Sequence, residues 1–409
     1  MTNKMNKMKA RIRLMAGVLM AVCVLAACRD EMPDMQNPRT DINIYNWSQL
    51  FESYWSGMNY NYVFWDIDPT DWDAVYDEYK PKFDALADKG FSDKETNDEA
   101  FGMLEELSSG LIDGHFILTL TLPSDTVSYL PSLVRKEQRP NYHPFDEQTL
   151  VDYANMLLGL HDAGRFSDAR LVLAPESGNA LYASGILDED IVYFRLSSFM
   201  LSEHVGTGDI VDQIVANYHD LLDNYPTVEG VIIDVRHNTG GYLADMPLVL
   251  GKLVNEETLM FYTRQKGGIG RLDYTPWTPE VLKPTERSRD LDVPIVVMAD
   301  MNSVSMAEMT TLAVLGLPKG CFIGERTHGG TGTLATDNLV FDQFYGGYFK
   351  INNIMEVHTT MTMMKDLDGV NHEGVGISPT IEALFDGENL RQGVDTQLER
   401  AVQYIRTGE

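Results

Sequence analysis

Residues 230–241 read GVIIDVRHNTGG, and this stretch decides the fold. The apolar run at 231–233 ends in Asp234, as in a strand that is buried on both faces and emerges at the edge of a sheet. The pair Gly240 and Gly241 follows, and two glycines let a backbone N–H approach a ligand without an intervening side chain. We therefore interpret the stretch as a buried strand followed by one half of an oxyanion hole.

A nucleophile at a helix start would supply the other half. Residues 302–308 read NSVSMAE and follow a second apolar run at 293–299. Ser305 would stand at the helix N-terminus, where free N–H groups and the helix dipole stabilise negative charge. The N–H of Met306 would then join Gly240 or Gly241 in the oxyanion hole. From the residues alone, Ser303 and Ser305 can each be a nucleophile or a helix cap.

These segments resemble the serine peptidase family that includes the carboxy-terminal processing (tail-specific) proteases and the tricorn core protease. The family pattern is an apolar strand with DxRxNxGG, then S-x-S-x-x-E opening a helix, then GERT-x-G. Its counterparts here are residues 233–241, 303–308 and 324–329. The resemblance covers roughly residues 186–381 and implies an α/β fold with a crotonase-like (ClpP-like) peptidase core. In the family the reactive serine stands three residues before Glu308, which selects Ser305 and leaves Ser303 as a cap.

The resemblance also indicates which base serves the serine, because a hydroxyl is a poor nucleophile without one. Tail-specific proteases place a Lys where Gly330 stands here, so the Ser–Lys mechanism is not available. The tricorn-like branch uses a His in an Asp-x-His sequence, which corresponds to His115. That branch adds a Ser just before the His, replaced here by Gly114, and a late Glu, which corresponds to Glu373. The implied catalytic residues are Ser305, His115 and Glu373, with water or another hydroxyl as a bridge.

Two further histidines remain alternative bases. His328 lies in the segment that carries the Lys in relatives, and His372 lies beside Glu373. Charged and polar residues at the end of the central strand are interpreted as structural, holding the glycine loop in shape through hydrogen bonds rather than contacting substrate. These are Asp234, Arg236 and Asn238.

Residues 1–28 form a targeting segment. Five basic residues precede an apolar core at 14–24, which is too short to span a bilayer with margin. Leu-Ala-Ala-Cys at 25–28 resembles a bacterial lipobox, so we expect Cys28 to be lipidated; the alternative is an ordinary signal peptide with an incidental Cys. The prediction is a protein of the cell envelope, at the outer membrane or cell surface, that meets the membrane through its lipid anchor alone.

Charge and cysteine content narrow the function further. The formal charge is −29 and becomes −34 when residues 1–27, with five basic side chains, are removed. Such a protein repels phosphates, so nucleic-acid binding is excluded as a function. Cys321 is then the one unmodified cysteine, which rules out an intramolecular disulfide; its apolar neighbours indicate core packing.

The predicted organisation has five parts: the signal segment (1–28), a polar tether (29–45), an N-terminal helical domain (46–112), an entrance strand with a non-PDZ insertion (113–185), and the peptidase core with a C-terminal helix (186–409). Apolar periodicity predicts helices at 47–58, 71–86 (interrupted at Pro81), 98–107, 146–160, 209–222, 246–254, 306–315 and 397–405. Strands are predicted at 116–122, 231–234, 293–299 and 320–324.

The function implied is a serine peptidase that hydrolyses peptides or unfolded protein tails through an acyl-enzyme on Ser305. No cofactor is expected, and the scattered histidines lack metal-ligand spacing, so no metal is assigned. The rival is a non-catalytic binding protein on the same fold, as in the related interphotoreceptor retinoid-binding protein. Gly330 and Gly114 favour the rival, whereas the joint presence of Ser305, His115, Glu373 and the glycine pair favours the peptidase.

Overall fold

A computed structural model describes residues 43–123, 125–174, 180–268, 270–287, 289–334 and 346–409. The predicted signal segment, Cys28 and most of the tether lie outside the described residues. Among the described residues, every helix is too short or too polar to cross a bilayer.

A seven-stranded sheet organises the larger lobe. Its order is β14-β10-β9-β6-β5-β4-β3, parallel from β14 to β5 and antiparallel at β4 and β3. The strands are β3 (Phe166–Ala174), β4 (Ala180–Leu187), β5 (Ile191–Leu196), β6 (Gly230–Asp234), β9 (Ile295–Ala299), β10 (Gly320–Gly324) and β14 (Ile381–Glu382). The predicted central strand is therefore β6, between two parallel neighbours.

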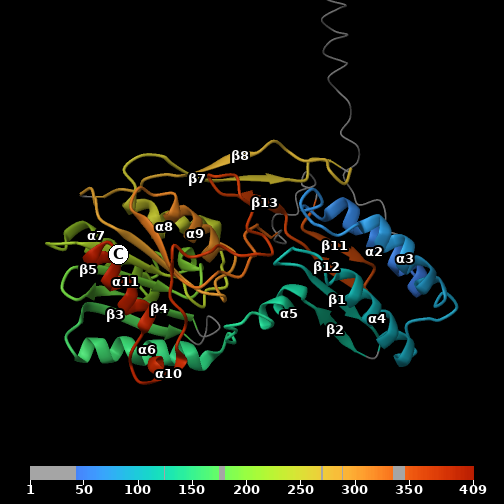
Figure 1. Cartoon of the computed structure of the whole chain (residues 1–409), viewed down its shortest axis with the longest axis horizontal. Coiled ribbons are helices and arrows are strands. Elements are labelled where there is room, and N and C mark those ends of the chain that lie inside the picture. The colour runs from blue at the N-terminus through green and yellow to red at the C-terminus, as the bar shows by residue number, and fades with distance from the viewer. Residues whose placement is uncertain (1–42, 124, 175–179, 269, 288, 335–345) are drawn as a thin grey trace, which may run out of the picture.

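Helices cover both faces of this sheet, which confirms the α/β prediction (Figure 1). One face carries α7 (Ile210–Asn224), α8 (Met246–Leu250) and α9 (Met306–Leu315). The other carries α6 (Glu147–Asp162), α10 (Gly387–Arg391) and α11 (Thr396–Thr407). Along β6, Val231 and Ile233 enter the first core and Ile232 the second, because successive side chains of a strand point to opposite faces. This explains the uninterrupted apolar run of the sequence.

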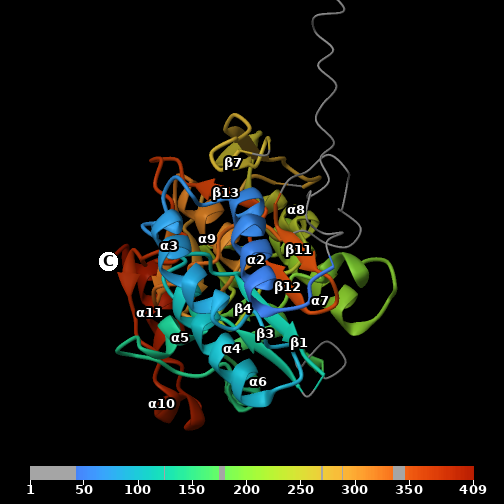
Figure 2. The ribbon, with the colours of Figure 1, turned by 90° about the vertical axis from the view of Figure 1, so that its right-hand side faces the viewer.

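The smaller lobe packs three helices on a second sheet (Figures 1 and 2). The helices are α2 (Trp47–Asn61), α3 (Trp72–Asp84) and α4 (Lys94–Ser108), and each begins after an Asn or Asp that caps a backbone N–H. The sheet has the order β11-β12-β1-β2, with strands β1 (Ile117–Thr121), β2 (Thr126–Tyr129), β11 (Tyr348–Ile351) and β12 (Met355–His358). Half of this sheet thus comes from the late part of the chain.

Two predictions need correction. The boundary at 185/186 is wrong, because β3 and β4 lie before it or across it and belong to the main sheet. Their burial is set by pairing with β5, which periodicity within residues 123–185 does not reveal. Pro81 does not divide its helix, since α3 runs through it to Asp84; a proline near a helix end removes little of the hydrogen-bond ladder.

A β-hairpin and a short helix lie where the two lobes meet. The hairpin of β7 (Thr258–Gln265) and β8 (Thr278–Leu282), extended by β13 (Thr362–Lys365), runs along the upper edge in Figure 1. Its ion pairs Arg264–Asp66 and Arg271–Asp73 reach the smaller lobe. The short helix α5 (Pro131–Glu137) lies between the lobes on the opposite side. Cys321, in β10, is a buried free thiol in the core, as predicted.

Candidate active site

Ser305 stands in an unusual backbone conformation directly before α9. Its φ is 57° and its ψ is −117°, a combination that is costly for a residue with a side chain. The side chain is half-buried, and within the described part of the chain it makes no capping hydrogen bond to α9. The hydroxyl is therefore not used as a helix cap, which removes the alternative role considered from the sequence.

The hydroxyl of Ser303 is engaged in hydrogen bonds to the backbone. Its side chain is fully buried, its Oγ donates to the carbonyl of Val235 at 2.8 Å, and the N–H of Asp300 donates to it at 2.9 Å. These bonds tie the turn before α9 to the end of β6. Ser303 is thus a structural residue, although it holds this turn rather than capping the helix.

The glycine pair lies against Ser305. A Cβ on Gly240 would come within 2.7 Å of Ser305 Cβ and 3.1 Å of the Met306 nitrogen. A Cβ on Gly241 would lie 2.0 Å from the carbonyl oxygen of Phe199, and its φ is 140°, so both positions require glycine. The N–H of Gly240 already donates to Asn238 Oδ1 at 2.7 Å. Gly241 and Met306 remain as the predicted oxyanion donors.

The polar residues at the end of β6 form the scaffold of this loop, which confirms the prediction that they are structural. Asp234 is fully buried and accepts from Arg195 at 2.6 Å and from Arg236 Nε at 2.9 Å. Those two guanidinium groups hold the pKa of Asp234 well below its usual range, against the cost of burial. Asn238 donates to the carbonyl of Leu196 at 2.8 Å.

Glu308 holds the neighbouring loop. Its buried carboxylate accepts from Thr327 Oγ1 at 2.6 Å and from the N–H groups of Gly329 and Gly330, each at 2.8 Å. The carbonyl of Gly330 in turn accepts from the N–H of Ser305 at 2.9 Å. The Glu of the sequence motif thus positions the loop that supports the serine.

Gly330 also contacts His115. A Cβ at Gly330 would lie 3.2 Å from His115 Cε1, so the imidazole occupies the space beside this glycine. Ser305 and His115, which are 190 positions apart in the sequence, therefore both lie beside Gly330.

Thr360 stands behind His115. Its Oγ1 lies 3.4 Å from His115 Nδ1 and donates to Asp113 Oδ1 at 2.7 Å. Because its proton goes to the carboxylate, the Thr360 oxygen can accept the Nδ1–H of the imidazole, which leaves the Nε2 lone pair as the basic site. Burial lowers the pKa of His115 to about 4, so the ring is neutral at pH 7.

The carboxylate of Glu373 binds backbone N–H groups of the segment that carries His115 and of the loop after Gly330. It accepts from the N–H of Gly114 at 2.8 Å and from the N–H of Thr331 at 2.9 Å. No hydrogen bond joins Glu373 to His115 among the described residues, although one ligand atom from each of Asp113, His115 and Glu373 lies within 4.8 Å of the others. Both carboxylates already accept N–H donors, so the group is built as an anchor rather than as a cation site.

Asp113 and Glu373 form a buried carboxyl pair. Burial raises the pKa of Asp113 to about 6. Burial and the nearby charge of Asp113 raise the pKa of Glu373 well above its ordinary value. With its pKa near 6, Asp113 is mostly ionised at pH 7, and its negative charge faces Thr360.

The two alternative bases lie in different places. His328 lines the same cavity as His115, and burial lowers its pKa to about 3. His372 points to Asp366, with Nε2 2.8 Å from Oδ2.

Helix α5 fastens both halves of the site. Arg135 donates to the carbonyl of Leu111 at 2.8 Å, shortly before His115. Lys136 Nζ donates to Asn302 Oδ1 at 2.9 Å, shortly before Ser305. Just after the helix, Arg139 donates to the carbonyls of Thr327 and His328 at 2.6 and 2.7 Å. Sequence reasoning missed these residues and Thr360, because no local pattern marks a side chain that acts on a distant segment.

Known proteins are similar to this chain in sequence and in fold. Residues 190–383, from β5 to β14, match peptidase family S41. The chain contains a family S41 peptidase domain. Residues 45–90, with α2 and α3, match the Tricorn protease C1 domain. The predicted family resemblance is thus confirmed over the peptidase domain.

Individual relatives have low sequence identity to this chain. The nisin-resistance protein of Lactococcus lactis subsp. lactis is 28% identical over 173 residues, which are 41% of this chain and 50% of that protein. The chain thus spans about half the length of the curated relative it matches. A candidate peptidase of Parabacteroides merdae has the same fold, with a TM-score of 0.62, 22% identity, and coverage of 88% of this chain and 96% of that one. Mature CPAF is similar in fold, with a TM-score of 0.56, 12% identity, and coverage of 88% and 96%.

Proposed function

We propose that this protein hydrolyses peptide bonds in peptides or unfolded protein segments, with Ser305 as nucleophile and His115 as general base. One observation carries the proposal: Ser305 stands at a strained helix start beside Gly240, and both its N–H and the neutral ring of His115 lie beside Gly330. His115 would take the proton of Ser305 during attack and return it to the leaving amine. The Gly241 and Met306 N–H groups would stabilise the oxyanion.

In this proposal Thr360 and Asp113 orient the base, and Glu373 acts on it indirectly through the backbone of Gly114. The Thr360 hydroxyl takes the place of the Ser that precedes the His in the tricorn-like branch, where this chain has Gly114. Asp113 would stabilise the imidazolium that forms when the serine is deprotonated. Glu373 would hold the backbone at Gly114 and so the direction of the His115 ring.

The test uses a mixed peptide library and the protein starting after Cys28. We expect the parent to release fragments and Ser305→Ala and His115→Ala to release none above background, since removing a member of such a dyad typically costs about 10⁴–10⁶ in kcat. A fluorophosphonate probe should modify Ser305 in the parent, as located by mass spectrometry. Equal fragment patterns from the parent and a folded Ser305→Ala variant would refute the peptidase and favour a binding protein.

We further propose that Cys28 carries a lipid that anchors the protein at the cell envelope. The motif Leu-Ala-Ala-Cys at 25–28 supports this. In cells grown with a clickable palmitate analogue, the full chain should be labelled and its Cys28→Ser variant should not. Equal labelling of the two would refute the anchor.

A further inference from the structure

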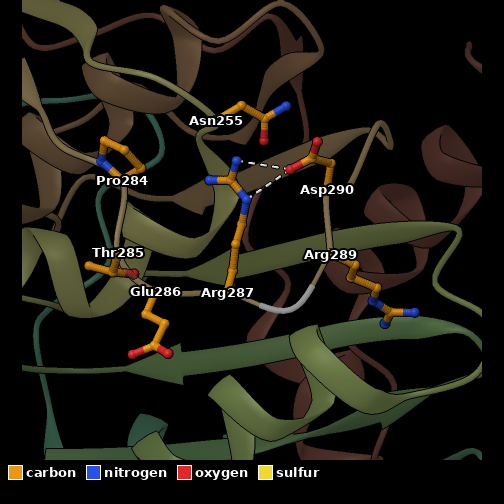
Figure 3. A pocket seen from close by; sticks show the side chains of 7 residues that line it. All are labelled: Asn255, Pro284, Thr285, Glu286, Arg287, Arg289 and Asp290. Atoms are coloured by element: carbon orange, nitrogen blue, oxygen red, sulfur yellow. Dashed lines mark hydrogen bonds and ion pairs between the residues drawn. The ribbon is translucent and has the colours of Figure 1, made fainter.

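Two recesses in the described structure differ in the residues that line them. The larger, of about 560 Å³, is lined mainly by charged and polar residues around residue 287 and by none of the proposed catalytic residues (Figure 3). Its guanidinium groups are already engaged, because Arg287 pairs with Asp290 at 2.8 Å and Arg289 donates to the carbonyl of Leu222 at 2.8 Å. This recess offers a ligand little that is not already bonded.

The second recess, of about 400 Å³, lies beside the reaction centre. Its lining includes His115, Val304 next to Ser305, and Thr239 next to Gly240. A substrate whose carbonyl reaches the oxyanion donors would therefore place a neighbouring side chain at this opening. The apolar lining residues are Ile117, Leu130, Leu133, Phe145, Val304 and Leu334.

We propose that this cavity receives an uncharged, apolar side chain of the substrate next to the reactive bond, and that its lining residues Leu130, Leu133 and Phe145 determine this specificity. This rests on the proposed peptidase function. A cavity of about 150 Å³ lined by aliphatic and aromatic side chains binds benzene. The cavity here is therefore large enough for a Leu, Met or Phe side chain. Burial of such a side chain against its apolar walls is favourable.

The polar groups of the cavity discriminate by charge. Lys136 is buried in its wall and donates to Asn302 Oδ1, so a basic substrate side chain would meet a like charge. An acidic side chain would have to leave water for a largely apolar space with a single ammonium group nearby, which costs more than the pair returns. His328, neutral at pH 7 because burial lowers its pKa, adds no charge.

The wall formed by α5 is fixed to the catalytic loops. Arg135 and Arg139 bind the backbone on either side of the reaction centre, so Leu133 on the same helix is held in a constant place relative to Ser305. A rigid wall gives selectivity, because a misfitting side chain cannot be relieved by movement of the helix.

The experiment changes the wall at Leu133 and uses Val134 as its matched control. The two are neighbours with exposures of 40% and 42%, but in the described structure only Leu133 lines the cavity. We expect Leu133→Arg to lower kcat/KM for a peptide with Leu beside the cut by about 10-fold or more, and to affect the Ala analogue far less. Val134→Arg should leave both unchanged. Equal effects of the two variants, or cut sites without apolar enrichment, would overturn the proposal while Ser305-dependent cleavage stands.

A binding assay separates this inference from the proposed reaction. Fluorescein-labelled pentapeptides Ala-Ala-Xaa-Ala-Ala, with Leu, Ala, Lys or Glu at Xaa, are titrated against Ser305→Ala by fluorescence anisotropy. Leu should bind several-fold tighter than the other three, and adding Leu133→Arg should abolish the difference. If Leu shows no advantage, the pocket assignment is wrong, whether or not the parent cleaves peptides.

Discussion

The imidazole of His115 fills the space that a side chain at position 330 would need. A Cβ built on Gly330 would lie 3.2 Å from His115 Cε1 and 3.4 Å from its Nδ1. Position 330 is also where the resembling tail-specific proteases carry their catalytic Lys. In the proposed mechanism His115 takes over the role of that Lys, and Gly330 leaves room for its ring.

Gly330→Ala tests this relationship. The new methyl group would press His115 and Val304 Cγ1 (3.3 Å away) aside by a few tenths of an ångström. We expect kcat to fall about 10-fold with little change in KM or Tm, because small displacements of a catalytic group are costly. Gly159→Ala in α6 is the control, since no described atom lies within 4 Å of its Cβ. An unchanged kcat in Gly330→Ala would show that His115 does not act from this position.

Thr360 is predicted to orient the base through its hydroxyl. Thr360→Val keeps the shape but removes the bridge between Asp113 and His115, and we expect kcat to fall about 10²-fold. Thr360→Ser should retain most of the activity, because it keeps the oxygen. The measurement is kcat and KM for one peptide, with Tm as a check on folding. Equal activity of the Val and Ser variants would exclude a role for the hydroxyl.

The pH profile should show two ionisations. His115 acts as a base when neutral, and its pKa is lowered to about 4, so kcat/KM is lost as pH falls through about 4. Asp113 has a pKa raised to about 6, so its charge, and its support of the imidazolium, is gained as pH rises through about 6. The parent should rise in both ranges, and Asp113→Asn should lose the upper rise. An upper rise that persists in Asp113→Asn would assign it to another group.

Gly241→Ala tests the oxyanion loop. Its Cβ would collide with the Phe199 carbonyl at 2.0 Å, and the loop that aims the N–H at the substrate would have to move. Loss of one such donor typically lowers kcat by about 10²–10³. Gly164→Ala shares a positive φ, 75°, but no described atom lies within 4 Å of its Cβ, so it controls for backbone strain alone. A similar small loss in both variants would remove Gly241 from the oxyanion hole.

Local signals made much of this structure predictable. The strand at β6, the helix after Ser305 and the capped helices of the smaller lobe each follow from patterns within about 15 residues, where periodicity and capping act. The glycine pair and Ser305 belong to motifs of the same length. These parts of the prediction needed no knowledge of which segments meet in space.

Distant contacts were not predictable in this way. Thr360 reaches His115 across 245 positions, and β12 pairs with β1 across a similar separation. A threonine or a short strand carries no mark of its remote partner, since its role is set by tertiary packing. For the same reason the residues of α5 and the following Arg139 looked unremarkable in sequence, although they donate hydrogen bonds to three separate segments of the chain.

Because α5 lies between the two lobes, we expect the protein to lose activity before either lobe unfolds. His115 directly precedes Phe116 of the smaller lobe's core, and Ser305 directly precedes Met306 of the main sheet's core. We therefore expect that the two lobes can loosen from each other while each stays folded. Mild denaturant should therefore silence the enzyme while amides of β6 and β9 remain protected from hydrogen exchange, and dilution should restore activity. Two denaturant concentrations are compared, that of half-inactivation and that of global unfolding. Arg139→Ala should lower the first and leave the second unchanged. Activity would then be lost reversibly when the lobes separate locally, without unfolding of either lobe.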